Sequence, residues 1–107
     1  MSYQNHYVID FSKVTYHAQM HEVIRIALDF PDYYGNNWDA FWDSLRDMIG
    51  QSMRIQIRRF DVIQKRFPEE AKVFIEILKE FKHYRNDSYC DEIVIEMEED
   101  GKTIYVL

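Results

Sequence analysis

Three aspartates recur at four-residue intervals near the middle of the chain: Asp39, Asp43 and Asp47. On a helix, this spacing places the three carboxylates along one face. Like charges at this spacing destabilise a helix by roughly 0.2–0.5 kcal/mol per pair, so helix stability does not explain the row. The row has three interpretations: an ordinary solvated helix face, a surface for a basic partner, or an Mg²⁺ site of an acidic enzyme.

Other candidate sites are weaker. His17 and His21 also lie four residues apart and could share Zn²⁺, but a zinc site needs at least a third ligand. Because the sequence identifies no such ligand, exposed helical histidines are the simpler interpretation. Cys90 has no evident histidine partner, and we assign it no nucleophilic role. We therefore expect no catalytic residues, no metal site and no cofactor.

The charge of the chain is unevenly distributed. Its 107 residues include 13 basic and 19 acidic side chains, for a net charge of −6, which disfavours general nucleic-acid binding. Residues 29–47 hold five acids and one base, residues 54–66 hold five bases and one acid, and residues 87–100 hold seven acids and no base. A negatively charged segment of this kind suits either a basic partner or a plain solvated surface.

The composition also indicates a compartment. The lone cysteine excludes an intramolecular disulfide and favours a reducing, cytoplasmic environment. The longest apolar run, residues 104–107, is too short to span a membrane. The first residues have neither the basic nor the apolar region of a secretory signal. We expect a cytoplasmic protein that does not bind membranes.

Hydrophobic periodicity predicts an alternation of strands and helices. The expected elements are a strand at 7–11, a helix at 16–28 closed by Pro31, a helix at 38–49 ended by Gly50, a strand at 53–58, a helical turn at 61–66, a helix from Pro68, a strand from Ile93, and a strand at 103–107 after the Asp100-Gly101 turn. Helical crossovers between the first three strands imply a parallel sheet, and the tight hairpin makes the last strand antiparallel. The expected class is α/β.

Residues 30–45 read FPDYYGNNWDAFWDSL. The pattern P-x-Y-Y-G-x-N-x-D-A-x-W-D-x-L within them closely resembles the barstar family, small cytoplasmic inhibitors of barnase-type ribonucleases. The resemblance implies one barstar-like domain over residues 1–107, with a three-stranded parallel sheet packed by helices. Residues 99–107 would be an added C-terminal hairpin strand.

The same resemblance assigns roles to residues of the helix. Asp43 would be the central inhibitory carboxylate, occupying the place of a substrate phosphate, and Asp39 would pair with basic groups at the rim. Trp42 would anchor the helix to the core, and Asn37 would cap it or lie next to the cap. Arg46 departs from the family pattern, because a cation there opposes a basic active site unless Asp43 or Asp47 pairs with it.

Further contacts are implied outside the helix. Tyr33 would stack against the enzyme from the Tyr-Tyr-Gly loop that also contains Tyr34, and Gly35 would allow close backbone approach. Glu80, late in the long helix, would be another acidic contact.

The function expected from these residues is that of a non-enzymatic intracellular inhibitor. It would be monomeric when free and would bind one basic, extracellular-type ribonuclease. Two alternatives stay open: an immunity protein or binding module for a different basic target, and a carboxylate–Mg²⁺ enzyme.

Overall fold

The computed structural model of the chain describes residues 5–31, 35, 37–48, 52–88 and 92–107. These residues form, in chain order, β1 (Asn5–Asp10), α1 (His17–Ala27), α2 (Trp38–Arg46), β2 (Met53–Arg58), α3 (Phe60–Arg66), α4 (Pro68–Ser88), β3 (Ile93–Glu99) and β4 (Lys102–Val106). The predicted alternation of elements is confirmed. The predicted α/β class is confirmed as well.

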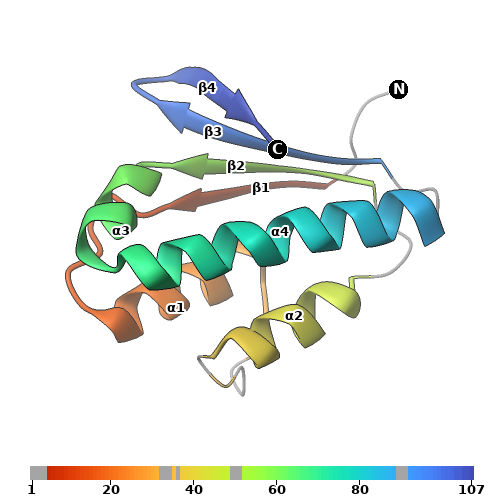
Figure 1. The fold of residues 1–107 in the computed structure, drawn as a ribbon, viewed down its shortest axis with the longest axis horizontal. Coiled ribbons are helices and arrows are strands. Elements are labelled where there is room, and N and C mark those ends of the chain that lie inside the picture. Colours follow the sequence, from red (N-terminus) through yellow and green to blue (C-terminus); the bar gives the residue numbers. More distant parts are fainter. Residues whose placement is uncertain (1–4, 32–34, 36, 49–51, 89–91) are drawn as a thin grey trace.

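The sheet has the strand order β1-β2-β3-β4, which is the order of the chain. β1, β2 and β3 are parallel, and β4 is antiparallel to β3. Both helical crossovers advance across the sheet in the same direction, so right-handed connections place their helices on the same face. Figure 1 shows α1, α2 and α4 together on one side of the sheet, with α3 at the end of β2. Among the described residues, no helix covers the other face.

The two-residue turn before β4 agrees with its sequence. Asp100 has φ 52° and Gly101 has φ 78°, so both residues adopt the left-handed conformation of a tight hairpin. The strand that follows lies at the edge of the sheet, and its apolar side chains Ile104, Tyr105 and Val106 are each more than half exposed.

Helix α2 is shorter than its apolar pattern predicts. We expected it to extend over residues 38–49, but it ends at Arg46, with Asp47 as the C-cap. The Met48 N–H donates to the Leu45 carbonyl at 3.1 Å, which tightens the last turn, and the Met48 side chain enters the core from beyond the helix. Burial alone therefore explains why Met48 is apolar. Gly50, the expected end of the helix, lies outside the described residues.

An aromatic cluster joins the helical layer to the sheet. Phe74 of α4 is fully buried, and four rings surround it. Their centroids lie 5.5 Å away for Phe11, 6.0 Å for Trp38, 5.5 Å for Phe41 and 6.3 Å for Phe60. Since Trp38 and Phe41 belong to α2, this cluster fixes one face of α2 against α4.

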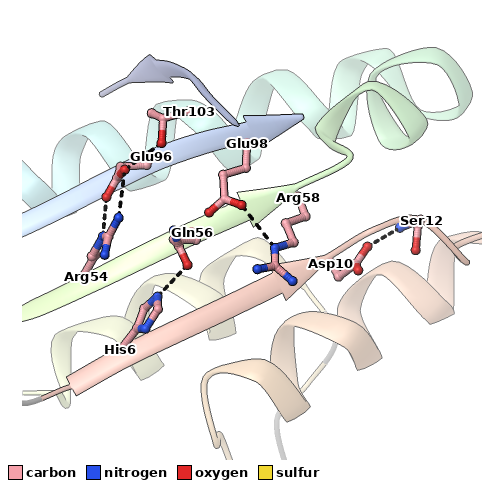
Figure 2. Close-up of polar contacts among 9 residues, drawn as sticks. All are labelled: His6, Asp10, Ser12, Arg54, Gln56, Arg58, Glu96, Glu98 and Thr103. Atoms are coloured by element: carbon pink, nitrogen blue, oxygen red, sulfur yellow. Dashed lines mark hydrogen bonds and ion pairs between the residues drawn. The ribbon is translucent and has the colours of Figure 1, made fainter. Parts of the chain in front are cut away.

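Charged pairs cover the sheet face that has no helices (Figure 2). Arg54 donates from Nε to Glu96 and from Nη2 to Glu96 Oε2 at 3.2 Å, and Arg58 Nε lies 3.3 Å from Glu98 Oε1. The Thr103 hydroxyl adds a hydrogen bond to Glu96 at 3.0 Å. Two of the basic residues in segment 54–66 therefore pair with two of the acids in segment 87–100. Ion pairs between the adjacent strands β2 and β3 thus explain some of the basic residues in segment 54–66 and some of the acidic residues in segment 87–100.

Phe74→Ala tests the aromatic cluster. Removing a fully buried phenylalanine should lower the free energy of unfolding by about 3–5 kcal/mol, because contacts are lost and a cavity remains. Urea denaturation monitored by circular dichroism measures the change. Lys72→Ala, an exposed change on the same helix, is the control and should shift stability by less than about 0.5 kcal/mol. Equal effects of the two variants would contradict the role given to Phe74.

Glu96→Gln tests the outer face. The hydrogen bond from Arg54 is the main cause that lowers the pKa of the Glu96 carboxyl from its ordinary 4.5. Its stabilising effect is therefore complete above pH 4.5 and is lost as the pH falls through the lowered folded-state value. Wild type should be more stable than Glu96→Gln at pH 7, by on the order of 1 kcal/mol, and the gap should close on acidification. Urea titrations at several pH values measure the gap, and a constant gap would refute the assignment.

Candidate functional site

The start of α2 is fixed by Asn37. This residue has extended backbone angles, and its side-chain oxygen accepts the Ala40 N–H at 2.8 Å, so it is the N-cap of the helix. Its side-chain amide donates to the Gly35 carbonyl at 3.0 Å. One side chain thus ties the end of the preceding loop to the first turn of α2. Tyr33 and Tyr34, the predicted loop contacts, lie outside the described residues.

Asp39 and Asp43 are exposed one turn apart on α2. Asp39 lies in the first turn, where the helix dipole favours a carboxylate. It makes no side-chain hydrogen bond or ion pair with any residue in the described ranges. The Asp43 side chain is 73% exposed, and its Oδ1 lies 3.9 Å from Nη1 of Arg46, itself 50% exposed. Since this contact is long and solvated, it leaves the Asp43 carboxylate accessible to a partner.

The opposite side of α2 holds the helix in place. Phe41 and Leu45 are fully buried. Trp42, the predicted anchor, is half-buried, and its ring centroid lies 6.0 Å from that of Tyr84 on α4. Trp38 reaches further, because its indole N–H donates to the Glu70 carboxylate in the first turn of α4. The helix is thus held by several side chains, and Trp42 is only one of them.

Glu80 comes from a different element. It is exposed on α4, one turn before Tyr84, so it shares the side of α4 that Trp42 contacts. Asn37, Asp39, Trp42, Asp43 and Arg46 all belong to α2 or to its cap.

A hollow beside the second half of α2 was not predicted from the sequence. It has a volume of about 290 Å³ and is lined by Tyr7, Leu28, Asp29, Phe30, Pro31, Ser44, Asp47 and Met48. Burial, and secondarily the Asp29 carboxylate, raise the pKa of the Tyr7 phenol. Two carboxylates at an open hollow could receive a basic side chain. No local pattern indicates this hollow, because its lining comes from β1, the segment after α1, and α2.

The fold and the site define a small α/β protein that displays a row of carboxylates on a well-anchored helix. In the part of the chain that the structure describes, no helix is long and apolar enough to cross a membrane. The family model "Barstar (barnase inhibitor)" matches residues 4–106, and the chain belongs to this family. The match extends through β4.

A curated relative agrees with the family. The chain is 30% identical over 77 residues to a Bacillus subtilis (strain 168) protein named "Putative ribonuclease inhibitor YrdF". The alignment covers 72% of this chain and 82% of that protein. The family and the relative both carry the name of a ribonuclease inhibitor.

Asn37→Ala tests the cap. Loss of the bond to the Ala40 N–H should lower the free energy of unfolding by about 1 kcal/mol, and amide exchange in the first turn of α2 should accelerate. Hydrogen exchange followed by NMR measures both effects. Asn37→Asp keeps an acceptor at the cap and should retain most of the protection. Slow exchange in Asn37→Ala would show that the core contacts alone hold the helix start.

Proposed function

We propose that this protein inhibits a barnase-type ribonuclease by binding it 1:1 and covering its active site with α2. The proposal rests on one observation: two exposed carboxylates, Asp39 and Asp43, lie one turn apart on a helix whose other side is fixed in the core. Asp43 occupies the position of a substrate phosphate, and Asp39 pairs with basic groups at the rim. The free inhibitor is a monomer of the cytoplasm.

The chemistry of a ribonuclease active site suits this arrangement. Such a site gathers cationic side chains to hold phosphate, so a carboxylate placed there accepts charge-assisted hydrogen bonds. Because α2 is already capped and packed, binding orders few additional groups, which lowers the cost of association. The acidic helix also accelerates encounter with a basic enzyme, an advantage that salt screens.

Other residues take part in the proposed contact. Tyr33 stacks on the enzyme from the loop that also contains Tyr34, and Gly35 permits close backbone approach. Trp42 holds the helix against α4, and Glu80 adds a carboxylate at the edge of the interface.

Arg46 favours a second candidate, an immunity protein or binding module for a different basic target. Its guanidinium is half exposed on the same helix as the two aspartates, where it would repel a cationic site. The carboxylate–Mg²⁺ enzyme has less support. Within the described ranges, the α2 aspartates do not converge with other His, Cys, Asp or Glu side chains into a group of three.

Asp43→Ala tests the proposed mechanism, with Asp47→Ala as the matched control. Each variant removes one negative charge: Asp43→Ala from within α2, and Asp47→Ala from its C-cap. Only Asp43 is assigned to the place that a substrate phosphate takes in the enzyme. Asp43→Ala should weaken binding by about 2 kcal/mol or more, roughly 30-fold in Kd, whereas Asp47→Ala should change it several-fold at most. Calorimetric titration of a purified barnase-type ribonuclease, at low and high salt, measures both, and RNA cleavage assays report inhibition.

Two results would count against the proposal. If Asp43→Ala binds as tightly as wild type, Asp43 does not have the assigned role. If wild type neither binds nor inhibits barnase-type ribonucleases, the second candidate replaces the first.

A further inference from the structure

The fold brings Glu70 to the two histidines of α1. His17 and His21 lie four residues apart, and their ring centroids are 5.1 Å from one another. Glu70 lies in the first turn of α4, 49 residues beyond His21 in the chain. One ring nitrogen of each histidine and one carboxylate oxygen of Glu70 all lie within 4.8 Å of one another. The cluster therefore contains the third ligand that the sequence alone does not identify.

The spacing of these atoms suits a tetrahedral transition-metal ion. Zn²⁺ binds histidine nitrogen and carboxylate oxygen at roughly 2.0–2.2 Å, so two ligand atoms of a tetrahedral site lie about 3.4 Å apart. Nε2 of His17 lies 3.5 Å from Oε2 of Glu70, close to this separation. The His21 nitrogen lies within 4.8 Å of both of these atoms, so a tetrahedral site requires it to move closer to them. Two imidazoles and one carboxylate leave a fourth position for water, as in open zinc sites.

The groups around the cluster favour metal binding. The Trp38 indole N–H donates to Glu70, and such outer hydrogen bonds hold a ligating carboxylate in orientation. His21 is only 1% exposed, and its ring packs against those of His17 and Trp38, so the surrounding side chains hold its imidazole in place. The Phe67 ring packs edge-on against His17, which restricts that side chain.

We propose that His17, His21 and Glu70 form a binding site for Zn²⁺. The bound ion would tie α1 to α4 and stabilise the folded chain by mass action. Through Trp38 it would also restrict the first turn of α2, next to Asp39. The site is independent of the proposed ribonuclease inhibition, because none of the three ligands belongs to the acidic row of α2.

Calorimetric titration of Zn²⁺ into the untagged full chain at pH 7 tests the proposal. Wild type should bind one ion at micromolar concentration, and excess Mg²⁺, which prefers oxygen ligands, should not displace it. His17→Ala and Glu70→Gln should each weaken binding by about 10-fold or more. His83→Ala removes an exposed histidine from α4 and is the matched control, which should bind as wild type does. Zn²⁺ should raise the Tm of wild type and of the control only.

A measurement on wild type makes the test independent of variant folding. When Zn²⁺ is added, the NMR signals of the ring nitrogens of His17 and His21 should shift to metal-bound values, while those of His83 should not. The proposal is overturned if no saturable 1:1 binding occurs, if His17→Ala and Glu70→Gln bind as wild type does, or if His83→Ala loses affinity equally. Ring-nitrogen shifts confined to other histidines would overturn it as well.

Discussion

The packing of aromatic rings around Phe74 is the constraint on which the rest of the structure depends. Around this ring, Phe11, which follows β1, meets side chains of α2 and α3, and Trp38 and Phe41 of α2 are both in contact with it. A helix of nine residues is too short to be stable on its own in water. Its structure therefore comes from this cluster and from the Asn37 cap, so the orientation of its aspartates is set by the core.

The one-sided arrangement of helices divides the charges of the molecule into two groups. On the face without helices, Arg54 and Arg58 are paired with Glu96 and Glu98, so the two signs largely cancel there. Helix α2, which carries Asp39 and Asp43, lies in the helical layer on the other side of the sheet (Figure 1). A net charge of −6 is a property of the whole chain, but the carboxylates that remain accessible to a partner include Asp39 and Asp43. This separation gives the acidic helix its electrostatic effect.

Patterns within one segment of the sequence predict the features that interactions within that segment determine. Apolar periodicity identifies the elements and their order, and Asn37 before an amphipathic helix indicates its cap. The pairing of Arg54 with Glu96 depends on strand register, which no single segment contains. For the same reason Glu70 cannot be matched with His17 from spacing, since the contact arises when α4 packs against α1. The sequence pattern overestimates the length of α2 for a related reason. Met48 is buried by tertiary packing although it lies outside the helix, and periodicity does not distinguish such a residue from one on the buried face of the helix.

Trp38 connects the histidine–glutamate cluster (His17, His21 and Glu70) with the acidic helix α2. The centroid of its indole ring lies 4.6 Å from that of the His21 ring, and its indole N–H donates a hydrogen bond to Glu70. Trp38 is also the first residue of the helix that carries Asp39. An ion bound at the proposed zinc site would therefore also restrict the first turn of α2, and a partner bound to α2 would restrict the histidine–glutamate cluster. Because linkage is reciprocal, any coupling between ion and partner must act equally in both directions. The magnitude of this coupling is limited by the freedom that the helix retains once Asn37 has capped its first turn.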